Sequence, residues 1–170
     1  SYNWAQYKTF SKEEALSHYD RPEEIAPMKT EEEYKEFVDG NVELLVKRVE
    51  QHPDTMFYFF YPPYSMLWWD NMYRSGELEQ VMYAAGTSAE RLLGYENVRM
   101  YYFQNDRDII LDLDQYMDPV HFTAEINQYM VEQMKEDNYR LTEENYLEEL
   151  DKMRKLAEEI REKEIKKYFP

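Results

Sequence analysis

An unbroken run of apolar and aromatic residues, Met56 to Tyr61, ends at the pair Pro62-Pro63. The length and composition of this run favour a β-strand that is buried on both faces, which is the type found in parallel sheets. Proline has no backbone N–H to donate to a sheet, so the pair turns the chain outward at the carboxyl end of the strand. This strand constrains the fold strongly, because a strand of this type needs a covering layer on each face.

A second strand is expected over residues 97–103, and a helix of about 77–93 lies between the two strands. The order strand–helix–strand implies a right-handed parallel crossover, which makes the fold class α/β. Two parallel strands alone do not make a stable sheet. We therefore expect the sheet to be completed by strands in the N-terminal lead-in, by an N-terminal half that is not in this chain, or by a second chain.

A capping box at Thr30-Glu31-Glu32-Glu33 predicts a helix over 30–51, because the Thr30 and Glu33 side chains can each bond the other's backbone amide. Further helices are expected over about 124–136 and after Thr142. The expected organisation is an irregular, aromatic-dotted lead-in at 1–29 (Tyr2, Trp4, Tyr7), a portion of an α/β domain at 30–136, and a C-terminal amphipathic helix at 137–170 that packs on the domain.

The composition excludes several classes of partner. The chain has 170 residues and a formal charge of −16, from 20 Lys plus Arg against 36 Asp plus Glu. Such a surface repels phosphate backbones and anionic lipid, so neither nucleic acid nor a membrane surface is an expected partner. The 17 Tyr, 8 Phe and 3 Trp indicate a folded domain rather than a disordered acidic tail. Because the chain begins at Ser1, we expect it to be a piece of a longer protein.

His121 is the strongest catalytic candidate among the three histidines. It lies in Asp118-Pro119-Val120-His121, between the second strand and a predicted helix. In such a loop the carboxylate can hold the imidazole through Nδ1 and leave Nε2 to take a proton from a serine. Catalytic groups of open parallel sheets gather at the carboxyl ends of the strands, where this loop is expected. A purely structural Asp–His pair is the alternative.

The aromatic segment after the first strand supplies candidate substrate-binding residues. Tyr64, Ser65, Trp68 and Trp69 follow the same edge of the sheet as His121, and the rings among them suit stacking on a sugar or an acyl group. The aspartates between Asp106 and Asp118 do not fit an EF-hand, which needs a glycine and a glutamate at fixed positions. We expect no metal ion, since cysteine is also absent. We also expect no cofactor, because the chain has only 4 Gly and no glycine-rich phosphate loop.

Three segments, taken in order, resemble the C-terminal part of SGNH/GDSL-type hydrolases: Phe59 to Ser65, Asn97 to Phe103, and Asp118 to His121 with the helix after it. The sequence is most similar to a bacterial branch that looks related to cell-envelope proteins of alginate acetylation and teichoic-acid D-alanylation. The resemblance implies a three-layer α/β/α, flavodoxin-like parallel sheet of which this chain is the C-terminal portion, with an extra C-terminal helix. It also implies that Asp118 and His121 are two members of a catalytic triad.

The family's nucleophilic serine lies in a Gly-Asp-Ser block, and no such block occurs in this chain. The serine is therefore expected upstream of Ser1. The resemblance further implies a location outside the cytoplasm, in a secreted or membrane-anchored protein, with the cytoplasm as the alternative.

Our first hypothesis is a fragment of an SGNH-like esterase or O-acyltransferase that acts on acyl esters of a bacterial envelope polysaccharide. The second is a non-catalytic domain of the same fold that binds carbohydrate or protein through the aromatic loop. A third is an acidic, mostly helical interaction module without the two strands.

Overall fold

Both predicted strands are present in the computed structural model, which describes residues 8–170. β1 (Phe57–Tyr61) pairs in parallel with β2 (Val98–Tyr102), in a register that places Phe57 opposite Val98. A third strand, β3 (Arg140–Leu141), pairs antiparallel with β2, and the order in the sheet is β1-β2-β3. The chain is therefore mixed α/β. The expected all-parallel sheet is wrong, because the two residues of β3 run against β2.

Three of the predicted helices form close to their expected positions: α2 (Glu31–Gln51), α4 (Leu78–Leu92) and α6 (Ala124–Lys135). The capping box before α2 is present, with the Thr30 amide donating to the Glu33 carboxylate at 2.7 Å. The last helix, α7 (Tyr146–Glu159), continues through a π-helical turn (Ile160–Glu164) and a 3-10 turn (Ile165–Lys167).

The irregular lead-in and the aromatic loop each contain a helix, α1 (Lys12–Ser17) and α3 (Met66–Arg74) respectively. Two further short helical segments follow β2: α5 (Arg107–Leu111) and a 3-10 turn at Leu113–Gln115. The lead-in aromatics Tyr2, Trp4 and Tyr7 lie outside the described residues.

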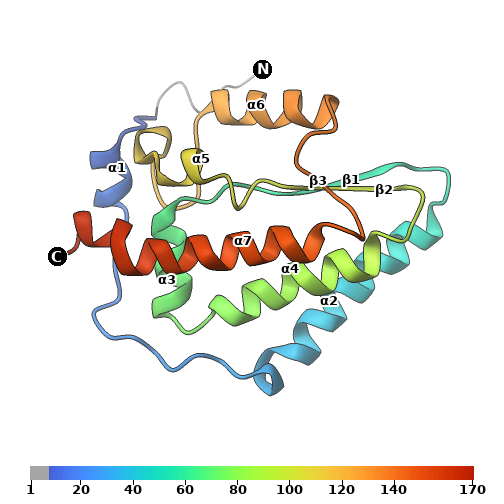
Figure 1. Cartoon of the computed structure of the whole chain (residues 1–170), viewed down its shortest axis with the longest axis horizontal. Coiled ribbons are helices and arrows are strands. Elements are labelled where there is room, and N and C mark those ends of the chain that lie inside the picture. Colours follow the sequence, from blue (N-terminus) through green and yellow to red (C-terminus); the bar gives the residue numbers. More distant parts are fainter. Residues whose placement is uncertain (1–7) are drawn as a thin grey trace.

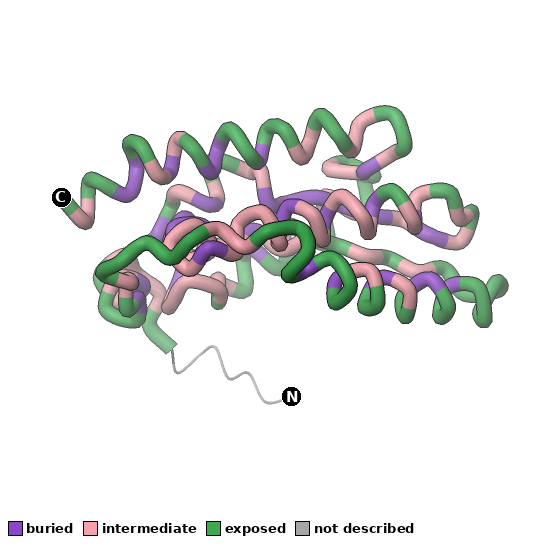
Figure 2. The backbone as a smooth tube through the Cα atoms, turned by 90° about the horizontal axis from the view of Figure 1, so that it is seen from below, coloured by how far each residue is buried: buried purple, intermediate pink, exposed green. Residues whose placement is uncertain are grey.

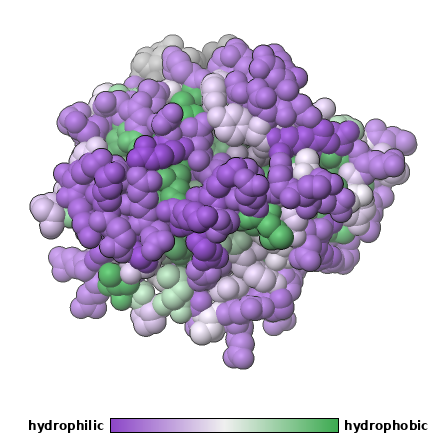
Figure 3. All heavy atoms as spheres, viewed as in Figure 1, coloured by the Kyte–Doolittle hydropathy of each residue, from purple (hydrophilic) through white to green (hydrophobic). Residues whose placement is uncertain are grey.

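The sheet separates two layers of helices, with α6 on one side and α2, α4 and α7 on the other (Figure 1). Side chains of β2 alternate between these layers. Met100 and Tyr102 belong to the large core with α4 and α7, while Tyr101 and Phe103, the residue after the strand, form a smaller core with Met130 of α6. The buried positions of the helices recur at intervals along each helix (Figure 2), whereas most of the surface in view in Figure 3 is hydrophilic. Among residues 8–170, no helix is long and apolar enough to cross a membrane.

β1 is an edge strand that is buried on one face only. Phe57, Phe59 and Tyr61 pack against the large core, whereas Tyr58 is 60% exposed and Phe60 is 48% exposed. The prediction that this strand is buried on both faces is therefore wrong, because α6 lies over β2 and leaves the second face of β1 open. The central strand β2 is the one that is enclosed on both faces.

The free edge of β1 carries unpaired backbone groups. The Phe57 amide donates to the Asn97 carbonyl at 2.8 Å, which directs residue 57 toward the β2 side. Alternate residues of a parallel strand bond to the same neighbour, so the N–H and C=O groups of Tyr58 and Phe60 point the other way. No strand within residues 8–170 pairs with that side.

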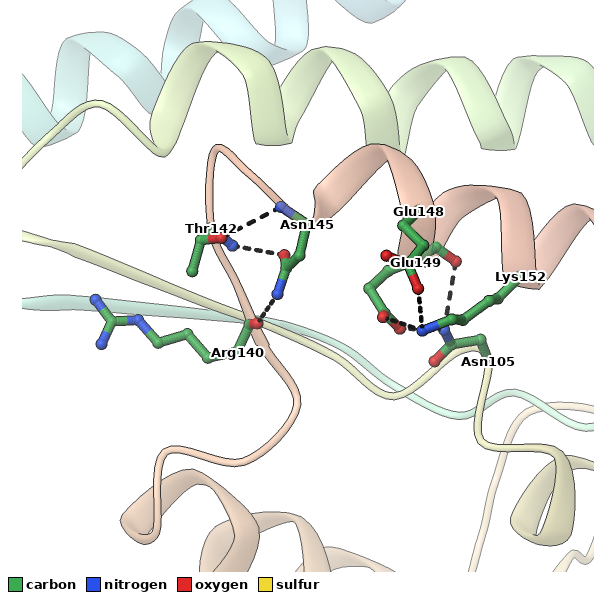
Figure 4. A network of polar contacts seen from close by, with 7 residues as sticks. All are labelled: Asn105, Arg140, Thr142, Asn145, Glu148, Glu149 and Lys152. Atoms are coloured by element: carbon green, nitrogen blue, oxygen red, sulfur yellow. Dashed lines mark hydrogen bonds and ion pairs between the residues drawn. The ribbon is translucent and has the colours of Figure 1, made fainter.

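The start of α7 is fixed by a polar network (Figure 4). Thr142 and Asn145 bond reciprocally, with the Thr142 amide donating to Asn145 Oδ1 at 2.8 Å and the Asn145 amide donating to Thr142 Oγ1 at 3.3 Å. The Asn145 amide group also donates to the carbonyl of Arg140 at 3.0 Å, which ties the helix to β3. One turn later, Asn105 Nδ2 donates to the Glu149 carboxylate at 2.6 Å. The helix begins after Asn145 rather than after Thr142, because the two bonds between these residues form a turn that precedes the helix.

A buried carboxylate joins the lead-in to α3. Asp70 is 2% exposed and accepts hydrogen bonds from the Tyr19 hydroxyl at 2.8 Å and from Arg21 Nε at 2.7 Å. The Arg21 guanidinium also lies 5.1 Å from the centroid of the Phe169 ring, near the C-terminus. A carboxylate is stable in the interior only with such partners, so Asp70 connects the lead-in, α3 and the C-terminal segment.

We expect Asp70→Ala to lower the free energy of unfolding by about 3 kcal/mol, because it leaves Tyr19 and Arg21 without their buried acceptor. Urea unfolding followed by tryptophan fluorescence measures this change. Asp20→Ala is the matched control, since Asp20 is exposed, and should change stability by less than about 0.5 kcal/mol. An equal effect of the two substitutions would contradict the role given to Asp70.

Candidate functional site

The loop that carries Asp118 and His121 is closed at its base by backbone bonds. Tyr116 and Phe122 form an antiparallel bridge, and the Met117 amide donates to the His121 carbonyl at 3.0 Å. The Tyr116 side chain is fully buried, and its hydroxyl donates to the Pro63 carbonyl at 2.6 Å. The loop is thereby anchored at the carboxyl end of β1, where the sequence predicts it.

Asp118 organises the loop and orients the imidazole of His121. Its Oδ1 accepts the amides of Val120 at 2.8 Å and of His121 at 2.7 Å, and its Oδ2 lies 2.7 Å from His121 Nδ1. Burial raises the pKa of Asp118, but the two amide bonds and the bond from the ring lower it by more, so this pKa lies below its usual value. An ionised carboxylate at Nδ1 favours the tautomer that carries its proton there, in which Nε2 is the basic nitrogen.

Ser65 supports this loop from behind. It is fully buried, and both its amide (3.1 Å) and its hydroxyl (2.8 Å) donate to the carbonyl of Pro119. Ser65 also precedes the first turn of α3. Ser65, which the sequence suggests as a substrate-binding residue, is thus a positioning residue, since it fixes the backbone between Asp118 and His121.

A pocket of about 580 Å³ opens beside the imidazole. The Tyr64 and Trp68 rings lie in its wall with centroids 4.9 Å apart. Trp69 is only 1% exposed and stacks edge-on behind Trp68, at 4.8 Å between centroids, so it does not line the pocket. Among residues 8–170, the lining consists of Phe60, Pro62, Tyr64, Trp68, Val120, His121, Phe122 and Asn127. We call this space the His121 pocket.

The structure therefore brings together four of the six residues singled out in the sequence, Asp118, His121, Tyr64 and Trp68, and sets Ser65 and Trp69 behind them. Phe60 and Asn127 are lining residues that the sequence did not indicate. Phe60 was expected to be buried, and the solvent-facing Asn127 carries no signal that separates it from other polar helix positions.

The aspartates around this loop serve local structure. Asp106 accepts the Ile109 amide at 3.3 Å and the Tyr139 hydroxyl at 2.6 Å, and Asp112 accepts the Asp114 amide at 3.2 Å. In the described part of the chain, no three His, Asp or Glu side chains are grouped as a metal ion would need. The chemistry available at the site is that of an oriented imidazole beside an aromatic pocket.

Comparison with protein-family models, with curated protein sequences and with solved structures gave no match to this chain.

The ring tautomer of His121 gives a direct test of the Asp118 bond. In the neutral imidazole we expect the Nδ1–H form to predominate, and Asp118→Ala to shift the ring toward the Nε2–H form. Long-range proton–nitrogen NMR correlation at pH 8.5 distinguishes the two. His18, whose Nδ1 lies 3.0 Å from the Glu14 carbonyl, is the internal control and should not change. An unaltered His121 signal in the variant would show that Asp118 does not orient the ring.

The lowered pKa of Asp118 also predicts a pH dependence of stability. A carboxyl whose pKa is lower in the folded state stabilises the protein above the unfolded value of about 4, and this contribution is lost as the pH falls through the folded value. We expect Asp118→Ala to cost about 1–2 kcal/mol at pH 7. In urea unfolding, the difference in free energy of unfolding between Asp118→Ala and the unsubstituted chain should shrink steadily below about pH 4. A difference that is constant down to acid pH would refute this assignment.

Proposed function

We propose that Asp118 and His121 are the acid–base pair of an SGNH-like esterase or O-acyltransferase, acting on acyl esters of a bacterial envelope polysaccharide. The observation that carries the proposal is the 2.7 Å contact between Asp118 Oδ2 and His121 Nδ1 at the rim of an aromatic pocket. His121 takes the proton of an attacking hydroxyl through Nε2 and returns it to the leaving oxygen, while Asp118 stabilises the imidazolium that forms.

The position of the pair supports this assignment. Pro62 and Tyr64 leave the carboxyl end of β1, and the Asp118 loop is bonded to that end through Pro63. Ligands of open α/β sheets bind at the carboxyl ends of parallel strands. Tyr64 and Trp68 present ring faces and edges that suit a sugar or an acyl group.

The nucleophile in this proposal is a serine upstream of Ser1. Ser65 does not qualify, because its side chain is buried and its hydroxyl is engaged with the Pro119 carbonyl. The open edge of β1 supports a larger sheet, since an added strand would find unpaired backbone groups there. In this proposal the complete domain is the three-layer, flavodoxin-like α/β/α fold, and it works outside the cytoplasm, where envelope polysaccharides are found.

Hydrolysis of p-nitrophenyl acetate tests the proposal on the 170-residue chain itself. From the chain alone we expect only the slow esterolysis of an oriented imidazole, and His121→Ala should abolish it. His52→Ala is the matched control, because His52 is exposed and lies at the other end of β1. A rate that survives His121→Ala, or that falls equally in His52→Ala, would overturn the assignment. With the serine present, His121→Ala should cost roughly 10³-fold or more.

A second candidate is a non-catalytic carbohydrate-binding or protein-binding scaffold domain, and the paired rings of Tyr64 and Trp68 favour it. Titration with acetylated and deacetylated oligosaccharides, followed by tryptophan fluorescence, separates the two functions. A binder would lose affinity in Trp68→Ala and keep it in His121→Ala, and it would show no esterolysis that depends on His121.

A further inference from the structure

A second pocket, of about 480 Å³, lies on the open face of the sheet near the start of β2. Its apolar part comes from Tyr58, Tyr101, Val131 and Met134, and its charged part from Arg99, Lys135, Asp137 and Arg140. We call it the cationic pocket.

The cationic pocket and the His121 pocket share both walls. Tyr58 lines the first and Phe60 the second, and these residues are two apart on one face of β1. On α6, Val131 lines the first and Asn127 the second, and residues four apart are neighbours on a helix. The pockets therefore form one groove between β1 and α6. Its stretch from residue 127 to residue 135 of α6 is roughly 12 Å long, at 1.5 Å per residue.

The middle of the groove is apolar and open to solvent. Tyr58 is 60% exposed, Phe60 48% and Val131 42%. The Tyr58 ring stacks on that of Tyr101, with centroids 6.5 Å apart and planes at 10°, which gives the floor a defined surface. A contiguous exposed apolar surface of this kind is characteristic of a ligand-binding groove.

The charge at one end is opposite to that of the chain. Within the described part of the chain, Arg99, Lys135 and Arg140 line the cationic pocket with a single carboxylate, Asp137, although the chain as a whole has a charge of −16. Asp137 accepts Arg140 Nη1 at 2.6 Å and the Tyr101 hydroxyl at 2.9 Å, and so serves to fix both. Arg99 Nη1 is held by two backbone carbonyls, at 3.0 Å and 2.7 Å. An excess of positive charge remains for a ligand.

We infer that the groove binds an extended amphiphile, whose apolar chain lies along β1 and whose anionic end, a carboxylate or a phosphate, sits in the cationic pocket. The other end of the ligand reaches the His121 pocket. The inference rests on the proposed function only for the chemistry in the His121 pocket, where the proposed function places an acyl ester beside the imidazole. It specifies a substrate that carries a negative charge about one groove length from the ester.

Binding of decanoate and of decyl phosphate, below their micelle concentrations, tests the inference by calorimetry and amide NMR shifts on the 170-residue chain. We expect at least one of them to bind and to perturb α6 from residue 127 to residue 135. Decanol and butyrate should bind at least about tenfold more weakly, because one lacks the charge and the other spans only one pocket. The affinities of decanoate and decyl phosphate, compared with each other, identify which anion the cationic pocket prefers.

Lys135→Gln and Arg99→Gln should each weaken binding by about tenfold. Lys155→Gln is the matched control: it removes the same charge from an exposed site on α7, across the sheet, and should have no effect. Lys135 is exposed, so its substitution tests the site without disturbing the core.

Failure of this inference is separable from failure of the proposed function. Decanoate binding reports on the groove, whereas the His121-dependent esterolysis of p-nitrophenyl acetate, an ester with neither an alkyl chain nor an anionic end, reports on the imidazole. Absence of binding by both anions, equal binding of decanol, or equal loss in Lys155→Gln would each overturn the groove assignment and leave the role of His121 standing.

Discussion

The in-register parallel pairing of β1 with β2 determines how the rest of the molecule is arranged. Because Phe57 lies opposite Val98, the odd-numbered side chains of β1 share a face of the sheet with the even-numbered side chains of β2. One face is covered by α2, α4 and α7 and holds the main core, and the other meets α6 (Figure 1). Since α6 packs over β2 through Met130, the second face of β1 stays open. The open groove is a direct result of a sheet whose covering layer is narrower than the sheet itself.

The site at the carboxyl end depends on backbone contacts that no side-chain motif reveals. Asp118 and His121 meet because the carboxylate closes a turn through the amides of residues 120 and 121, which places the imidazole where Nδ1 reaches Oδ2. Ser65 stabilises that turn, because its amide and its hydroxyl both donate hydrogen bonds to the Pro119 carbonyl. Spacing alone predicts the Asp–His pair, whereas the serine that supports it comes from a distant segment and could be recognised only in three dimensions.

Local signals predicted those elements that local interactions determine. The capping box set the start of α2, and a single five-residue aromatic segment marked β1. α3 was missed because the preceding prolines and clustered aromatics are typical of a loop, although the burial of Met66, Trp69 and Asp70 follows helical spacing. β3 has two residues, too few for any periodicity, and exists because β2 offers it an edge. Tertiary contacts also decide that β1 is a half-exposed edge strand, since composition cannot say which of two apolar strands is central.

The free edge of β1 has a consequence for how copies of this chain behave in solution. Tyr58 and Phe60 direct backbone donors and acceptors outward from a strand without charged residues, and such an edge is a template for edge-to-edge aggregation. Pro62 and Pro63 limit the length of any added ladder to the few residues before them. The charge of −16 keeps copies apart at neutral pH. The acidic surface and the double proline thus act together as protection against aggregation, and concentrated salt or acid removes only the first of them.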